Sequence, residues 1–297
     1  MKGNSLTSTR KKSLCLYIFF TGPAVVLFLI FIVCPLLLAF RNSFFDWNGI
    51  SKEYSFIGWE NYISVFKEKA FIDSIKFSLS YTLVTTASLN IFGLLVALAL
   101  NSRLKFRTAL RGAYFLPMVI SPIVIGYLWK IIVTRLFPYI GNLTKIELLS
   151  KSWLSYPETA FATLSIAVLW QLFGYFMMIY LTGLQGVPKE LLEAAEIDGA
   201  SPIARFLKVI FPMIRHSITI CVFLGLVTGL KAFDLIYSLT NGGPFGSTTS
   251  MAFQIYLDAF KRDMLSYASA KAIIFCIMFA AISLTQVALM KRKEVEA

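Results

Sequence analysis

Charged residues are scarce in this chain: Asp, Glu, Lys and Arg make up 15% of its 297 residues, whereas 57% are hydrophobic. Soluble domains carry about a quarter charged residues and about half apolar ones. One ordinary core could not bury this surplus of apolar side chains, so the composition indicates that lipid is part of the solvent. The net charge of +12 does not indicate a nucleic-acid-binding protein, because the basic residues lie between long apolar runs.

Residues that commonly carry chemistry are also few. The single histidine, His216, excludes an H-E-x-x-H zinc site, and we interpret it as a residue at the edge of a span. The chain has no G-x-x-x-x-G-K-[ST] phosphate loop, no G-x-S-x-G nucleophile motif and no C-x-x-C pair. Its four cysteines lie in apolar runs, as small apolar residues do. The sequence therefore predicts no catalytic centre, no metal and no cofactor in this chain.

Long uncharged runs are what the sequence does have. The first, Leu14–Phe40, exceeds the ~20 residues that span a bilayer and lacks the cleavage site of a signal peptide. Runs of this length in lipid must be helical. We predict an all-α integral membrane protein with six transmembrane helices. The other five are expected between Lys76 and Arg103, between Arg111 and Lys130, between Glu158 and Lys189, from His216 to about Ser238, and between Lys271 and Lys291.

Six spans put both termini on one side of the membrane. The N-terminal tail and the loop from Asn101 to Arg111 contain basic residues and no acid, which is typical of cytoplasmic segments. We therefore expect both termini, and the loop at residues 188–212, in the cytoplasm of a cell with a bacterial-type plasma membrane. The aromatic residues between Arg41 and Lys76 fit an interfacial belt or a helix lying on the membrane.

The polar stretch from Pro188 to Pro212 interrupts the apolar runs. Pro188 suits the first position of a helix, and Gly199 suits a left-handed cap that ends it. Ser201 and Pro202 then fit the N-cap and first residue of a second helix. From this pattern alone, the stretch is a capped surface helix joining two membrane spans.

The residues of this stretch carry a resemblance. Glu193-Ala194-Ala195, Gly199 four positions on, and Val209-Ile210-Phe211-Pro212 resemble the EAA–G–I-x-L-P motif of binding-protein-dependent ABC importer permeases, with Val209 and Phe211 departing from the usual Ile and Leu. Two further segments are similar to the carbohydrate-uptake branch of that family, namely Phe233–Pro244 and Tyr267–Ala270. The first span resembles that of the larger maltose permease and of the first glycerol-3-phosphate permease.

The resemblance implies a type I ABC importer transmembrane domain at residues 71–290, preceded by a tail, first helix and outer loop at 1–70 and followed by a tail at 291–297. It implies a second homologous permease, two ATPase subunits that hold ATP and Mg, an external solute-binding protein, a sugar substrate and a lipid bilayer as partners, and no nucleic acid. It also implies which residues couple the permease to the ATPase: Glu193, Ala194, Ala195, Asp198, Gly199 and Pro212.

Polar residues inside the spans are the candidates for a substrate path, because such groups usually face protein or a water-filled cavity. The candidates are Gln171, Thr228, Lys231, Asp234 and Asn90. Hydrogen bonding between helices is the alternative for each. Lys231 and Asp234, three residues apart, could instead form an ion pair on one helix face or reach the interface.

Three other functions compete with an importer permease. An ion-coupled secondary transporter would favour an isolated intramembrane acid and inverted repeats, and neither is evident. A membrane enzyme would need a catalytic cluster, which the chain lacks. A non-catalytic membrane scaffold would have no use for the motif between Glu193 and Pro212.

Overall fold

The computed structural model describes residue 16, residues 19–102 and residues 105–291. The predicted N-terminal tail, the first residues of the first span and the tail after residue 291 lie outside the described residues. The chain divides into two compact units. One comprises Met1–Val65 with Asp258–Ile274, and the other comprises Phe66–Leu257 with Phe275–Ala297.

The first unit contains the first membrane helix. Residues Phe19–Asn42 form one helical stretch of 24 residues, most of them apolar, which includes a π-helical turn, η1 (Leu29–Val33), and α2 (Cys34–Asn42). A small antiparallel hairpin follows, in which β1 (Phe45–Asp46) pairs with β2 (Ser55–Phe56) and Phe45 lies opposite Phe56. The side chain of Asn61, in α3 (Glu60–Lys67), donates to the carbonyls of Ser43 and Phe45 at 2.9 Å each. The Asn61 side chain therefore joins α3, which follows the hairpin, to the residue before the hairpin and to its first strand.

The other part of the first unit holds a buried ion pair. It comprises the end of α15 (Met251–Phe260) and the start of α16 (Leu265–Lys291). Lys271 is fully buried and its Nζ lies 2.5 Å from Oδ2 of Asp258, which is 1% exposed. We expected Lys271 to mark the outer edge of the sixth span, and this was wrong. The helix begins six residues earlier, because the carboxylate allows the ammonium group to be buried.

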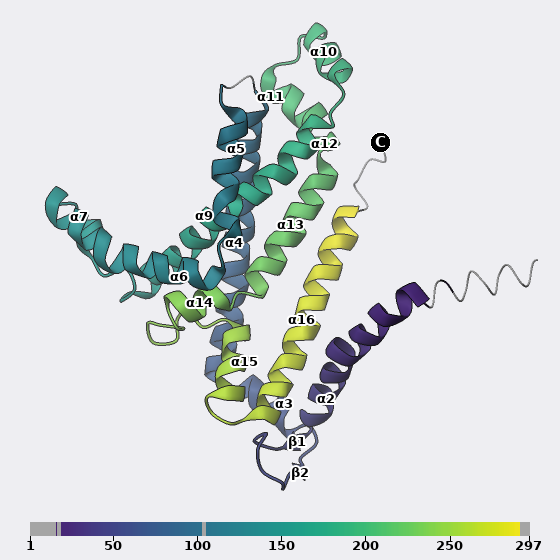
Figure 1. The fold of residues 1–297 in the computed structure, drawn as a ribbon, viewed down its shortest axis with the longest axis vertical. Coiled ribbons are helices and arrows are strands. Elements are labelled where there is room, and N and C mark those ends of the chain that lie inside the picture. The colour runs from purple at the N-terminus through teal and green to yellow at the C-terminus, as the bar shows by residue number, and fades with distance from the viewer. Residues whose placement is uncertain (1–15, 17–18, 103–104, 292–297) are drawn as a thin grey trace, which may run out of the picture. The chain divides into compact units, whose positions relative to one another are not determined.

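The second unit is built around three long helices: α4 (Lys69–Asn101), α9 (Pro157–Gln185) and α13 (Arg215–Leu230). Helix α4 packs along both α9 and α13 (Figure 1). Their shared core contains Leu89, Phe176, Tyr180 and Cys221. The backbones of α13 and α4 approach closely at Gly229, where a Cβ atom would lie 2.5 Å from the Cα of Thr82. A small residue at a helix interface permits this approach, as in other membrane proteins.

The third predicted span is not continuous. Residues 107–131 form α5 (Arg107–Phe115), a 3₁₀ turn, η2 (Leu116–Val119), and α6 (Pro122–Ile131), with extended backbone at Ile120 and Ser121 between them. Pro122 explains the break, because proline disfavours helical backbone in the residue before it. The continuous helical stretch that is long enough to cross a membrane runs instead from Pro122 to Thr144. It consists of α6, a π-helical turn, η3 (Ile132–Leu136), and α7 (Phe137–Thr144), and the short α8 (Glu147–Ser150) follows.

The fifth predicted span also ends early. Helix α13 stops at Leu230, and the chain leaves helical geometry before α14 (Asp234–Leu239) begins. The hydroxyl of Ser250 donates to the carbonyl of Ala232 at 2.6 Å, which provides a partner for backbone that the break leaves open. Ser238, the predicted end of this span, belongs to the separate helix α14.

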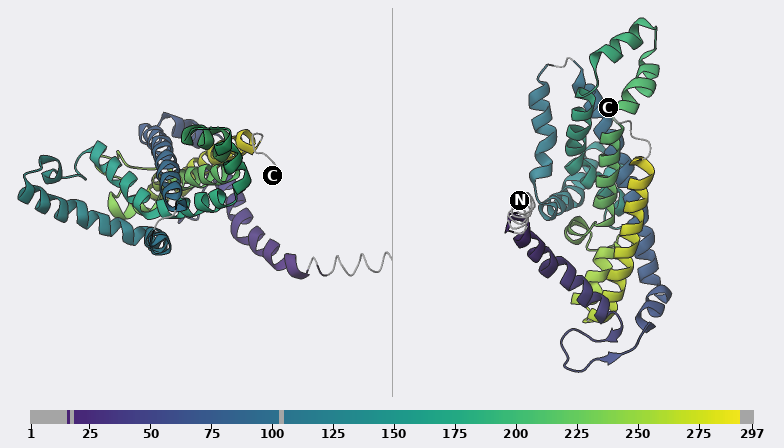
Figure 2. Two further views of the ribbon diagram at one scale, coloured as in Figure 1. Left: turned by 90° about the horizontal axis from the view of Figure 1, so that it is seen from above. Right: turned by 90° about the vertical axis from the view of Figure 1, so that its right-hand side faces the viewer.

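Two short helical segments connect α9 to α13. They are α10 (Lys189–Ile197) and the stretch Pro202–Met213, which contains α11 (Pro202–Arg205), a π-helical turn, η4 (Phe206–Ile210), and α12 (Phe211–Met213). Figure 1 shows α10 and α11 beyond the ends of α9 and α13, and the right-hand view of Figure 2 shows the same projection from the side. The described residues contain five helical stretches long and apolar enough to span a membrane, or six if the bent pair Pro202–Met213 and Arg215–Leu230 counts as one. The predicted all-α membrane fold is confirmed, with the two-residue strands β1 and β2 as an addition.

Candidate functional site

Helix α10 carries the first group of predicted site residues. It begins at Lys189, one residue later than predicted, because Pro188 has an extended ψ of 132° and precedes the helix. Leu192 and Ala195 are half-buried, whereas Glu193 and Ala194 on the same helix are exposed. Leu192 also packs against the core of the three long helices. One side of α10 therefore rests on the protein, while the Glu193–Ala194 side is open to another molecule.

The end of α10 is formed as the sequence predicts. Gly199 has a φ of +74°, a left-handed conformation that a side chain disfavours. Gly199 N–H donates to the carbonyl of Glu196, and Ala200 N–H donates to that of Ala195, both at 3.0 Å. These two bonds form a Schellman cap, which satisfies carbonyls at the helix end and fixes the direction of the exiting chain. Asp198 is the residue just before the glycine and is exposed.

The second half of the loop is fixed as well. The Ser201 hydroxyl accepts a hydrogen bond from the N–H of Ala204 at 3.2 Å, so it caps the helix that Pro202 begins, as predicted. Arg205 forms an ion pair with Glu196 at 3.3 Å, which joins α11 to α10. The sequence analysis missed this pair, although a Glu and an Arg on either side of a capped turn are a usable signal. The chain then bends by 73° near Ile214, two residues after Pro212, before α13 begins.

Most of the predicted substrate-path residues line one cavity. It comprises about 500 Å³ of space, part of it open to solvent. Four of the five substrate-path candidates line it: Gln171, Thr228, Lys231 and Asp234. Its other lining residues, which the sequence analysis did not select, are Tyr81, Pro122, Val168, Leu172, Ala232, Phe233 and Leu235. The breaks before Pro122 and after Leu230 both border this space, so the two interrupted spans help to form it.

Two polar side chains of the cavity retain hydrogen-bonding capacity. Gln171 is 4% exposed and its Nε2 donates to the carbonyl of Ile120 at 2.9 Å, but its Oε1 accepts no hydrogen bond from the described part of the chain. The Thr228 hydroxyl likewise has no partner among the described residues, whereas Thr82 and Thr85 donate to carbonyls of their own helix. An oxygen at Gln171 and a hydroxyl at Thr228 are therefore available to a ligand.

Lys231 and Asp234 do not form the ion pair on one helix face that was an alternative to substrate contact at these positions. Lys231 caps the end of α13 and Asp234 begins α14, because the chain breaks between them. The Lys231 ammonium lies 5.4 Å from the centre of the Phe279 ring, and no ion pair joins it to Asp234 in the described ranges. Both side chains are exposed at the cavity and contribute one charge of each sign to its wall.

Asn90 lies apart from this cavity. Its Oδ1 accepts a hydrogen bond from the Tyr180 hydroxyl at 2.5 Å, and its Nδ2 donates to the carbonyl of Thr86 at 2.7 Å. Asn90 belongs to α4 and Tyr180 to α9, so the amide joins two membrane helices. This is the helix–helix hydrogen bond that was the alternative to substrate contact at this position.

Comparison with known proteins places the chain in a family. Residues 89–294 match the family of binding-protein-dependent transport system inner membrane components. The chain is 34% identical to the probable starch degradation products transport system permease protein AmyD of Thermoanaerobacterium thermosulfurigenes, over 94% of this chain and 95% of that protein. It is 33% identical to the multiple sugar-binding transport system permease protein MsmF of Streptococcus mutans, over 91% of this chain and 93% of that protein.

The fold is shared with a solved structure. A chain from the crystal structure of a bacterial ABC transporter involved in the import of the acidic polysaccharide alginate matches with a TM-score of 0.83 and 22% identity, over 97% of this chain and 98% of that one. A chain from the crystal structure of a bacterial alginate ABC transporter in complex with an alginate pentasaccharide-bound periplasmic protein matches with a TM-score of 0.80 and 21% identity, over 96% of each chain. The match over residues 89–294 and the identity to AmyD show that the chain belongs to the binding-protein-dependent transport system inner membrane components: it is a multi-pass permease subunit of an ABC importer and is not itself catalytic.

Proposed function

We propose that this permease passes a sugar or oligosaccharide across the plasma membrane after an external solute-binding protein delivers it. The observation that carries the proposal is the cavity bordered by Gln171 and Thr228, whose amide oxygen and hydroxyl have no hydrogen-bond partner among the described residues. Relatives named for starch degradation products, multiple sugars and arabinooligosaccharides support a carbohydrate cargo.

The chemistry of the cavity suits a carbohydrate. A sugar offers many hydroxyl groups and flat apolar ring faces. Tyr81 and Phe233 provide aromatic surface, while Gln171, Thr228 and Asp234 provide oxygen atoms that accept hydrogen bonds from hydroxyls. Lys231 adds a donor. The opposite charges of Lys231 and Asp234 leave the wall without a strong net sign, which favours a neutral cargo over an ion.

We assign coupling to the ATPase to the loop at residues 188–212. Glu193 and Ala194 are exposed on α10, and the small Ala194–Ala195 surface allows a partner to approach the helix backbone closely. The cap at Gly199, the Ser201 cap that follows it and the pair of Glu196 with Arg205 restrain the loop. A restrained loop transmits a movement of the bound subunit that a loose connector would absorb. Asp198, Gly199 and Pro212 fix the chain direction within this element.

The remaining parts of the assembly follow from this assignment. A second homologous permease completes the path, and two ATPase subunits bind ATP with Mg on the cytoplasmic side. Both termini and the loop at 188–212 lie in the cytoplasm, and the permease domain comprises residues 71–290. ATP binding in the partner subunits shifts the permease between inward-facing and outward-facing states, which requires the partner to bind the two states with different affinities.

An ion-coupled carrier is the competing function, and the position of Asp234 argues against it. This acid begins α14 at a chain break and is exposed, whereas a coupling acid is usually enclosed within the membrane. A scaffold without transport would not need a cavity with unused hydrogen-bonding groups.

The test is sugar uptake by the reconstituted complex in proteoliposomes. Thr228→Val and Gln171→Leu should each reduce uptake roughly three- to tenfold at subsaturating sugar, since each removes about one hydrogen bond to the cargo. Uptake should require ATP on the side of the membrane where the ATPase subunits lie, and it should persist when proton and sodium gradients are collapsed. Thr219→Val is the matched control, because Thr219 lies on the same helix, bonds to the Arg215 carbonyl and is not part of the cavity.

The outcomes separate the competing functions. Normal uptake by both cavity variants would refute the proposed sugar path. Uptake that stopped with the ion gradient and ignored ATP would refute the ATP-driven mechanism. Equal loss in Thr219→Val would indicate damage to α13 and not to cargo binding, which would also count against the proposed contacts.

A further inference from the structure

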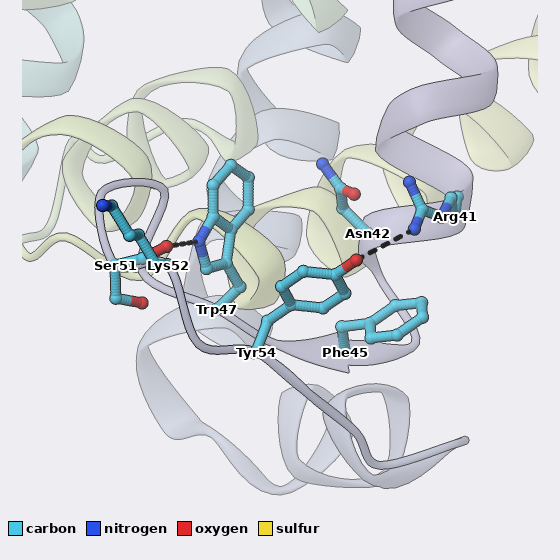
Figure 3. Close-up of a pocket in the computed structure, with 7 residues that line it drawn as sticks. All are labelled: Arg41, Asn42, Phe45, Trp47, Ser51, Lys52 and Tyr54. Carbon is cyan, nitrogen blue, oxygen red and sulfur yellow. Dashed lines mark hydrogen bonds between the residues drawn. The ribbon is translucent and has the colours of Figure 1, made fainter.

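A second pocket lies in the first unit and shares no lining residue with the cavity described above. It comprises about 450 Å³, part of it open to solvent, and is lined by residues from the end of α2 and the hairpin loop: Arg41, Asn42, Phe45, Trp47, Ser51, Lys52 and Tyr54. Figure 3 shows Arg41 and Lys52 toward opposite ends of this pocket, with the rings of Trp47 and Tyr54 between them. The lining contains two cations, three aromatic rings and no carboxylate.

The pocket is held in shape by hydrogen bonds within the loop. The indole Nε1 of Trp47 donates to the carbonyl of Ser51 at 2.8 Å (Figure 3). The Asn48 side chain accepts hydrogen bonds from the N–H groups of Ile50 and Ser51 at 2.9 and 2.8 Å. The loop that carries Trp47 and Lys52 is therefore closed on itself before any ligand arrives, which reduces the entropy lost on binding.

Two aromatic rings hold the Arg41 guanidinium group in place, but most of its N–H groups have no hydrogen-bond acceptor among the described residues. One guanidinium nitrogen donates to the Tyr54 hydroxyl at a long 3.4 Å, and the group lies 5.5 Å from the Phe45 ring centre and 6.0 Å from that of Tyr54. No ion pair joins Arg41 or Lys52 to a carboxylate within residues 19–102 and 105–291. A guanidinium group has five N–H donors in a planar fork, the geometry that binds phosphate oxygens in pairs.

The position of Arg41 at the end of the first membrane helix indicates that a phosphate bound there would belong to a lipid headgroup. Arg41 is in the last turn of the apolar helix Phe19–Asn42, which is long enough to cross the hydrocarbon layer. Its side chain therefore lies at the level where hydrocarbon meets water, and lipid headgroups occupy that level. Aromatic side chains such as Trp47 and Tyr54 are typical of the same depth, and a basic pocket without an acid attracts anionic lipids.

We propose that this pocket binds the headgroup of an anionic phospholipid, with Arg41 on the phosphate, Lys52 adding positive charge, and Asn42 available to headgroup hydroxyls. The site is separate from the cargo cavity and does not depend on the proposed cargo. It does not depend on the orientation of the chain either, because headgroups are present at both surfaces. The bound lipid fixes the end of the first helix against the hairpin that follows it.

The experiment measures lipid binding to the purified transporter complex in detergent by native mass spectrometry. The complex is titrated separately with short-chain phosphatidylglycerol, short-chain phosphatidylcholine, and glycerol phosphate, the headgroup anion without its lipid tails. We expect a phosphatidylglycerol site that Arg41→Gln weakens at least about tenfold, because a charge-assisted contact is lost. Lys52→Gln should have a smaller effect in the same direction, and phosphatidylcholine should bind more weakly than phosphatidylglycerol at the site.

Lys67→Gln is the matched control, since it removes one exposed positive charge from the next part of the chain and does not line the pocket. It should leave phosphatidylglycerol binding unchanged. Equal binding of phosphatidylglycerol to the wild-type and Arg41→Gln complexes would overturn the proposal and leave Arg41 as an ordinary interfacial arginine. Glycerol phosphate binding as tightly as phosphatidylglycerol would also overturn it, because the site would then select a soluble anion and not a lipid.

Discussion

The buried pair of Asp258 and Lys271 gives a quantitative prediction. Lys271→Met removes the ammonium group and leaves the Asp258 carboxylate, which is 1% exposed, without its 2.5 Å partner. Removing one member of a buried ion pair costs about 3–5 kcal/mol, because an uncompensated charge stays buried. We expect the lower end, since Arg262 still contacts the other carboxylate oxygen at 2.6 Å.

The assay is thermal unfolding of the purified complex in detergent, followed by intrinsic fluorescence. A loss of about 3 kcal/mol corresponds to a fall of about 5 °C in the unfolding midpoint, because a chain of 297 residues has an unfolding entropy of roughly 0.6 kcal/mol/K. Asp258→Asn should be destabilising as well, because it leaves the Lys271 charge buried. The double variant should recover much of the loss, since removing both charges of a buried pair is often neutral.

The control is Lys76→Met. Lys76 lies 3.5 Å from Asp73, but both side chains are at least half exposed, so the pair resembles the Lys271 pair in chemistry and differs in burial. Exposed pairs contribute little to stability, so the midpoint should not change measurably. If Lys271→Met unfolded at the wild-type temperature, or if the double variant were no better than the single ones, the reasoning from burial would be refuted.

Two further predictions concern the loop at residues 188–212. Gly199→Val should impair substrate-stimulated ATP hydrolysis and uptake while the permease still inserts, because Gly199 needs positive φ and a β-branched residue disfavours it. Ala195→Trp should have the same effect through its bulk, and Glu193→Lys through its reversed charge. Normal stimulation of ATP hydrolysis in all three variants would show that the loop only connects two spans. Cysteines introduced at Ser102 and Ser201 should react with a membrane-impermeant reagent only from the cytoplasmic side. Cysteines introduced at Asn48, Ser150 and Ser247 should react only from outside. Labelling of Ser201 from outside would contradict both the topology and the proposed ATPase contact.

The loop could be predicted in detail from the sequence because its structure depends on local signals. A glycine that ends a helix, a serine that caps the next one and a proline in its first turn act over a few residues. Gly199 and Ser201 accordingly adopt the predicted roles. The prediction for Pro188 failed by one residue, a common error at helix ends.

The breaks in the third and fifth spans were harder to predict than the loop, since apolar composition does not distinguish a straight helix from a broken one. Pro122 was a readable signal for the break in the third span, and its effect on the preceding backbone was overlooked. The break after Leu230 had no such signal. It depends on Ser250, 18 residues from Ala232 along the chain, which supplies the hydrogen bond that makes the break tolerable.

The buried lysine and the cavity depend on tertiary contacts. Lys271 was placed at a span edge because a lone charge suggests water, and its partner Asp258 lies 13 residues away in another helix. The polarity of Gln171 and Thr228 made them candidates, but only packing shows that both face one space while Asn90 does not. Tyr81 and Phe233 carried no signal of their own, because aromatic residues are common throughout the spans.

Helix α13 connects the two proposed sites directly. Its first residue, Arg215, follows the 73° bend that ends the loop, and Thr228 and Lys231 at its other end line the cavity. Sixteen helical residues cover about 24 Å, so one rigid element spans the distance between loop and cavity. Gly225 and Gly229 let α13 lie close against α4 over this length. A rigid α13 would carry a displacement of the loop to the cavity wall at Lys231, where the helix ends. The break that sequence analysis missed is thus the point at which motion of the helix can alter contacts with cargo.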